Sequence, residues 1–265
     1  MARRLEDNGD PIGFQSTRNS AHMARTIMLA ELERLFSCVQ ASTAGRSEYM
    51  YAILEENCLG KRSGSTRRLD ARHLADLYAL DPSITLFRAL RYYWERDTAG
   101  HPFLALLCAC ARDALLRATA AFVLSIPEGA VLSRTMMEKY IEALEPGRFS
   151  KGTRKCTAQN INSTWTKAGH LTGRARKLRV KANPTPCAAA YALLLAYLQG
   201  GRGKSLFDSE HVRILDCPRE RAAELAEEAA RRGWLVFKRI GNVMDVTFPG
   251  LLTPEEVEWS REQSR

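Results

Sequence analysis

Apolar residues recur at helical spacing through the first half of the chain. This pattern predicts five helices, over about Met23 to Val39, Ser47 to Cys58, Thr66 to Leu80, Pro82 to Asp97 and Pro102 to Leu124. Ser65 or Thr66 suits the N-cap of the third helix, and proline stands in the first turn of the fourth and fifth, where a missing N–H costs nothing. The sequence therefore predicts an all-helical domain over residues 21–130, preceded by a polar, flexible arm over residues 1–20.

Two further amphipathic segments are separated by a short break. Ser133 to Leu144 predicts one helix, which Glu145-Pro146-Gly147 ends, and Ser150 to Ala168 predicts the next, with Ser150 as N-cap and Gly169 after its end. The segment from Leu171 to Lys181 then predicts a basic hairpin. Two helices joined by a short turn and followed by a hairpin are typical of a helix-turn-helix with a wing.

The last third of the chain mixes helix and strand patterns. It predicts an apolar helix from Pro184 or Pro186 to Leu198, an extended piece at Val212 to Leu215, a helix from Pro218 to Arg232, and strands over Trp234 to Arg239 and Val243 to Phe248. The last helix and hairpin resemble a second winged unit, but the mixed Glu and Arg residues of that helix favour packing or a protein contact over DNA. The fold class is therefore mainly α: a helical bundle domain, a helix-turn-helix or winged-helix-like region over residues 131–250 with a small C-terminal β-hairpin, and a tail over residues 251–265.

Positive charge is concentrated in one part of the chain. The 265 residues carry a formal charge of +9, whereas residues 146–207 contain twelve Lys and Arg and no acidic residue, which leaves about −3 for all the others. Such a one-sign segment repels itself unless a polyanion lies against it. The charge therefore favours a polyanionic partner, and together with the helix described next it predicts double-stranded DNA.

The predicted helix over residues 150–168 has two different sides. Ala158, Ile161, Trp165 and Ala168 share one side and should be buried, while Lys155, Gln159, Asn162, Ser163 and Thr166 share the other. Gln and Asn can pair bidentately with adenine, and Lys with guanine, in a major groove. The candidate DNA-binding residues are Lys151, Arg154, Lys155, Gln159, Asn162, Ser163, Thr166 and Lys167 on this helix, with Arg174, Arg176, Lys177, Arg179 and Lys181 on the wing. The alternative is a surface helix and loop that are merely basic.

A second cluster of basic residues lies at the start of the third predicted helix. Lys61, Arg62, Arg67 and Arg68 surround the turn Ser63-Gly64-Ser65-Thr66. Backbone N–H groups, hydroxyls and the helix dipole can bind a phosphate at such a turn, so these four residues are also candidate DNA contacts. A solvated basic turn is the equal alternative.

The sequence offers no support for catalysis, a metal or a cofactor. The seven cysteines are odd in number and form no CxxC pair, which favours reduced thiols in a cytoplasmic protein. The five histidines are scattered and show no metal-ligand spacing. The segment from Gly200 to Ser205 is not a Walker loop, because Leu198 occupies the position of its first glycine. Residues 103–126 are apolar but contain Arg112, Asp113 and Arg117, which favours a buried core helix over a membrane span.

One order of segments is distinctive: Ile53-Leu54-Glu55-Glu56-Asn57-Cys58-Leu59, the basic turn that follows, the helical middle, and Gln159 to Trp165 leading to Ala168-Gly169-His170-Leu171. This order resembles the BrxA-type accessory proteins of bacteriophage exclusion (BREX) systems. The resemblance covers roughly residues 50–248 and leaves residues 1–45 outside. It implies a mostly helical, non-enzymatic DNA-binding protein that serves phage defence alongside a methyltransferase, an ATPase and a phosphatase-like partner.

Three other functions remain open from the sequence. A transcription regulator would use the same winged element as a symmetric dimer on a palindromic site. A scaffold would dock an acidic protein on the basic face, and an RNA-binding protein would place RNA there.

Overall fold

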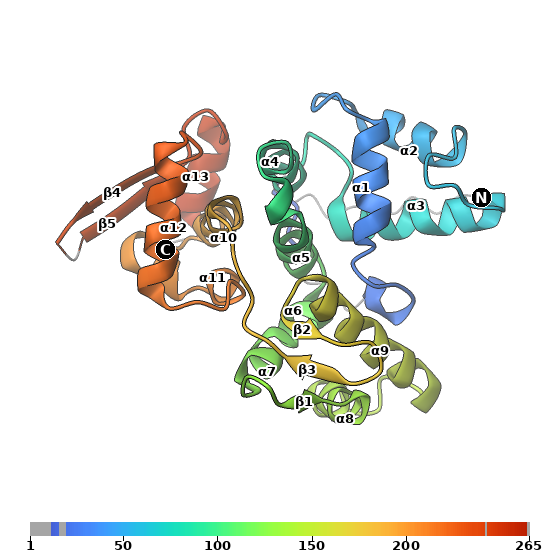
Figure 1. The fold of residues 1–265 in the computed structure, drawn as a ribbon. Helices are drawn as coiled ribbons and strands as arrows, with labels where there is room; N and C mark the ends of the chain where they lie inside the picture. Colours follow the sequence, from blue (N-terminus) through green and yellow to red (C-terminus); the bar gives the residue numbers. More distant parts are fainter. Residues whose placement is uncertain (1–11, 16–19, 242, 264–265) are drawn as a thin grey trace.

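A computed structural model describes residues 12–15, 20–241 and 243–263. The fold is mainly α, as predicted (Figure 1). The first half contains the short 3-10 helix η1 (Ala21–Met23) and the helices α1 (Leu29–Cys38), α2 (Arg46–Leu54), α3 (Gly64–Tyr78), α4 (Thr85–Trp94), α5 (His101–Arg112), α6 (Ala114–Ala118) and α7 (Ala120–Ser125), with the 3-10 turn η2 (Thr98–Gly100) before α5.

Two of the five helices predicted for this half are interrupted. The helix expected from residue 23 begins only at Leu29, because Met28 has a left-handed backbone and residues 24–27 are not helical. The long helix expected to end at Leu124 is divided into α5, α6 and α7. Asp113 has an extended backbone between α5 and α6, and its carboxylate accepts a hydrogen bond from the N–H of Leu116, so it caps a new helix inside the apolar run.

The middle of the chain forms the predicted helix-turn-helix with a wing. It consists of β1 (Val131–Leu132), α8 (Arg134–Leu144), α9 (Lys151–Lys167), β2 (Leu171–Thr172) and β3 (Lys177–Arg179). The strands form an antiparallel sheet in the order β1-β3-β2, so β1 before the two helices pairs with the second strand of the wing. Figure 1 shows this sheet beside α9, with α8 beneath it.

The C-terminal part consists of α10 (Pro186–Leu198), η3 (Gly203–Asp208), α11 (Glu210–Arg213), α12 (Arg219–Arg231), the hairpin of β4 (Val236–Ile240) and β5 (Val243–Thr247), and α13 (Pro254–Glu262). The extended piece predicted at Val212 to Leu215 is wrong, because Ser209 caps the short helix α11 there. The segment predicted as a C-terminal tail, residues 251–265, contains a helix over residues 254–262. Thr253 and Glu256 form a capping box for α13, and Glu256 also binds Thr85 and Arg88 of α4.

The core is centred on α10 and α5. Every residue of α10 from Cys187 to Leu198 is buried, and α10 packs against α4, α5, α11, α12 and α13. In the described part of the chain, no helix is both long and apolar enough to cross a membrane. The flexible arm predicted over residues 1–20 falls mostly outside the described residues, but Ile12 and Ser20 within it are buried.

Candidate nucleic-acid interface

One side of α9 is anchored in the core as predicted. Ala158, Ile161, Trp165 and Ala168 are buried. The indole N–H of Trp165 donates a hydrogen bond to the hydroxyl of Thr119 at 3.0 Å. This side therefore fixes the rotation of α9 about its axis and decides which residues it can present.

A second side of α9 is covered by residues 20–28. The hydroxyl of Thr164 accepts a hydrogen bond from the N–H of Ile27 and shares another with Nε2 of His22. His22 and Ser20 in turn bind the buried carboxylate of Asp113 at 2.8 and 2.7 Å. This buried polar network ties the segment before α1 to α9 and narrows the exposed face of that helix.

The remaining exposed face includes four of the five predicted residues. Lys155 and Gln159 are exposed, and Ser163 and Thr166 are half-buried. Asn162 was predicted to be exposed on this face, but it is only 4 % exposed. Its amide oxygen has no hydrogen-bond partner in the described structure. It lies four residues after Ala158 and three before Trp165, so it shares the buried edge with them.

The basic residues of α9 differ in their availability. Lys151 and Lys155 are exposed and have no carboxylate partner among the described residues. Arg154 instead pairs with Glu142 of α8 and is a weaker candidate than predicted. Lys167 is exposed and donates to the hydroxyl of Thr26 at 2.8 Å.

The wing carries two exposed cations at its turn. Gly173 has φ +92°, and a Cβ there would lie 2.1 Å from the backbone oxygen of Arg176, so the turn requires glycine. Arg174 and Arg176 are exposed on this turn. Lys177 is turned back and donates to the carbonyl of Gly173 at 2.8 Å, which stabilises the turn.

Arg179 was also predicted to contact DNA, and the structure contradicts this prediction. It is 4 % exposed, pairs with Asp216 at 2.6 Å, and also donates to the carbonyls of His170 and Val180. It therefore joins the wing to the chain before α12 and cannot reach a phosphate. Lys181, two residues later, is exposed.

The basic turn at the start of α3 is partly neutralised. Lys61 lies between Glu31 and Asp70, at 3.1 Å from each, and Arg67 donates to the carbonyl of Leu54. Ser63, not Ser65 or Thr66, is the N-cap. Arg62 and Arg68 remain exposed, and Figure 1 shows this end of α3 in a different part of the molecule from the wing.

The structure thus brings together a smaller set than the sequence predicted. Lys151, Lys155 and Gln159 on α9 and Arg174 and Arg176 on the wing turn are exposed on one winged element. Cys156 is exposed on the same face of α9 and was missed, since its apolar character gave no signal for DNA contact. Among the described residues, no group of three or more His, Cys, Asp or Glu side chains can hold a metal ion.

Comparisons with protein-family models and with curated proteins found no significant match for this chain.

Proposed function

We propose that this protein binds duplex DNA without catalysis, with α9 facing the major groove and the β2–β3 turn against the phosphate backbone. The observation that carries the proposal is the set of exposed cations Lys151, Lys155, Arg174 and Arg176 on one winged element. In a helix-turn-helix, the second helix reads base edges while flanking elements contact the backbone.

The resemblance to BrxA-type proteins supports a role as an accessory protein of a BREX phage-defence system. Its partners would then be duplex DNA and the methyltransferase, ATPase and phosphatase-like proteins of that system. A cytoplasmic location fits the seven cysteines, all of them free thiols in the structure.

The charges favour contact with the backbone over extensive base reading. With Asn162 buried, Gln159 is the amide on this face of α9 that remains exposed. One amide and two lysines give little discrimination between sequences, whereas the free cations give affinity for any duplex. Weak, sequence-tolerant binding is therefore the expected behaviour, and nanomolar binding to a palindrome would favour the transcription regulator instead.

The test is the affinity of the purified protein for a short fluorescent duplex, measured by anisotropy. Replacing Arg174 and Arg176 together by Gln should weaken binding by at least about tenfold, since each removes a charged phosphate contact. The control replaces Arg231 and Arg239 by Gln, two exposed arginines outside the winged element. Equal affinity of the wing variant and the parent would reject this interface.

Two further outcomes identify the other candidate functions. Tighter binding to a matched RNA than to the duplex would favour an RNA-binding protein. Absence of binding to either nucleic acid, with copurification of an acidic protein that the wing variant loses, would favour a scaffold.

A further inference from the structure

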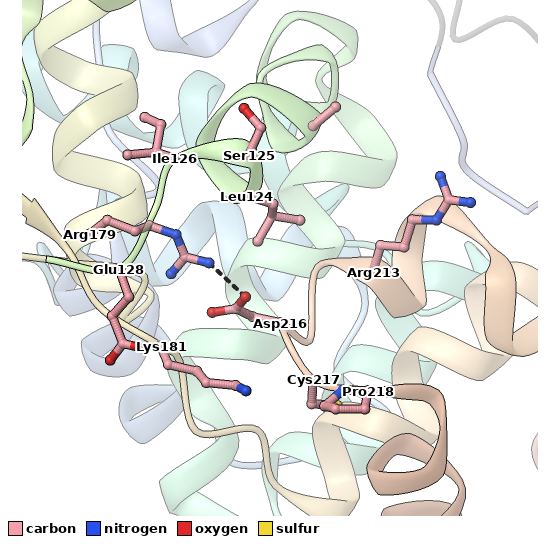
Figure 2. A pocket seen from close by; sticks show the side chains of 11 residues that line it. Leu124, Ser125, Ile126, Glu128, Arg179, Lys181, Arg213, Asp216, Cys217 and Pro218 are labelled. Carbon is pink, nitrogen blue, oxygen red and sulfur yellow. Dashed lines mark hydrogen bonds and ion pairs between the residues drawn. The ribbon is translucent and has the colours of Figure 1, made fainter. Parts of the chain in front are cut away.

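A cleft of about 660 Å³ lies at the base of the wing, and nothing in the proposed DNA interface uses it. We call it the wing-base cleft. It lies between the end of α7 with the turn after it, the chain that follows β3, and the link from α11 to α12 (Figure 2). Its volume falls within the range of small-molecule sites, about 300 to 1,000 Å³.

The cleft has an apolar wall. Leu124 and Ile126, from the end of α7 and the residue after it, line this wall, and Figure 2 shows both side chains above the central space. Pro218 lies at the opposite side. Such a wall can cover the ring of a ligand, which a bare anion would not need.

Two cations line the cleft from different parts of the fold. Lys181 comes from the wing side, and Figure 2 shows its chain extending into the space toward Cys217. Arg213 is at the opposite rim, on α11. Neither has a carboxylate partner in the part of the chain that the structure describes. Figure 2 shows the guanidinium of Arg213 turned away from Lys181, so Lys181 is the cation that can contact an anion in the cleft, and Arg213 adds positive charge at longer range.

A third cation forms the fixed back of the cleft. Arg179 is buried and pairs with Asp216, whose other oxygen accepts a hydrogen bond from the N–H of Ala182. These partners satisfy the Asp216 carboxylate, while Nε of Arg179 has no hydrogen-bond partner among the described residues. This Nε is itself buried, so Arg179 holds the back of the cleft in place and does not contact a ligand.

One carboxylate opposes an anionic ligand. Glu128 lines the cleft and is exposed, and Figure 2 shows its carboxylate turned outward, away from Asp216. With the Arg179–Asp216 pair counted as neutral, Lys181 and Arg213 outweigh Glu128 by one charge.

From these features we propose that the wing-base cleft binds a phosphate monoester of nucleotide size. Lys181 contacts the phosphate, Arg213 adds positive charge from the opposite rim, and Leu124 and Ile126 cover the ring. A phosphate monoester fits because its charge of about −1.5 to −2 at neutral pH is attracted to this net positive lining. The cleft belongs to the chain itself and binds this ligand without DNA.

The experiment is calorimetric titration of the full chain with AMP, adenosine and inorganic phosphate, in the absence of nucleic acid. AMP should bind, while adenosine and inorganic phosphate should each bind at least about tenfold more weakly, because each lacks half of the recognised groups. Equal binding of adenosine and AMP would overturn the phosphate contact, and equal binding of inorganic phosphate and AMP would overturn the apolar wall.

Variants locate the site. Lys181→Gln should weaken AMP binding by about tenfold, whereas Lys204→Gln, at another exposed lysine of the basic stretch, should not change it. Glu128→Gln should strengthen binding by about twofold, because it removes the opposing charge. No AMP binding at millimolar concentration, or the same affinity in Lys181→Gln and Lys204→Gln, would overturn the proposal. Neither result bears on duplex binding, so this site and the proposed function are tested separately.

Discussion

Gln159 is the exposed amide of α9 that can reach a base edge, and Asn162 is its buried counterpart. Gln159→Ala should reduce preference between duplex sequences by about 1 to 3 kcal/mol where Gln159 contacts a base, with little effect on folding. Asn162→Ala should instead lower the free energy of unfolding by about 0.5 to 3 kcal/mol and leave sequence preference unchanged.

Competition binding and denaturant unfolding of both variants separate these effects. A loss of sequence preference in Asn162→Ala at unchanged stability would contradict the observed burial. Unchanged preference in Gln159→Ala would leave α9 as a backbone contact only.

Two buried histidines make stability depend on pH. Burial lowers the pKa of His170 from 6.5 to about 4, and burial together with the nearby Arg117 lowers that of His211 to about 4. Nε2 of His170 donates to the carbonyl of Ile214 at 2.8 Å, and its Nδ1 has no partner among the described residues. The neutral form is therefore the one that fits the fold.

The free energy of unfolding falls as the pH is lowered, because the histidines take up protons at a higher pH in the unfolded chain than in the folded one. The unfolded histidines bind protons below about pH 6.5 and the folded ones only near pH 4, so their contribution is complete above 6.5 and falls as pH drops toward 4. The loss is at most about 1.4 kcal/mol per pH unit for each histidine. Unfolding free energies at about pH 7 and about pH 5 should differ less in a His170→Gln, His211→Gln variant than in the parent, and an equal difference would contradict the assignment.

The burial of a side chain was predicted correctly where the spacing of apolar residues along its own helix decides it. Trp165 and Ala158 were predicted buried from spacing alone, and both are. Asn162 was predicted to be exposed but is buried. The extent of the buried face of α9 depends on contacts with α8 and with residues 20–28, and helical spacing alone does not reveal these contacts. Arg179 was misplaced because its partner, Asp216, is 37 residues away.

At the scale of elements, the wing depends on one glycine. Gly173→Ala would place a Cβ against the backbone oxygen of Arg176 in a left-handed residue, so the turn must change shape. We expect DNA affinity to fall about as much as in the Arg174, Arg176 variant, with modest loss of overall stability. Anisotropy and thermal unfolding measure both quantities.

Gly233→Ala is the matched control. Gly233 also has a positive φ, +73°, but a Cβ there meets nothing within 4 Å, and it lies between α12 and β4. It carries the same backbone strain outside the wing. A comparable loss of DNA affinity in both variants would show that the effect comes from strain in general and not from the wing.

Most elements follow from local patterns, and the exceptions have identifiable causes. Ser150 and Gly169 bound α9 as predicted, since caps act within one turn. The division of the helix after residue 112 follows from Asp113, whose cap is reinforced by Ser20 and His22 far away in the sequence. The helix α13 was missed although Thr253 and Glu256 form a recognisable capping box.

At the scale of the whole molecule, folding sorts the basic stretch into bound and available charges. Of its twelve basic residues, Arg148, Arg154 and Arg179 pair with Glu145, Glu142 and Asp216. Arg202 stacks on Tyr197 and donates to Ser260, where it helps to hold α13. The composition gave the excess charge, but only the fold distinguishes the cations that hold the structure from those that face outward.

Those outward cations make the salt dependence of duplex binding the most direct test of the central claim. Each neutralised phosphate contributes a slope of about −0.9 in log K against log salt concentration, so contacts from Lys151, Lys155, Arg174 and Arg176 predict a slope near −3.6. Replacing Arg174 and Arg176 by Gln should reduce its magnitude by about 1.8, while replacing Arg231 and Arg239 should leave it unchanged. A slope near zero in the parent, or the same slope in the wing variant, would contradict DNA binding through this winged element.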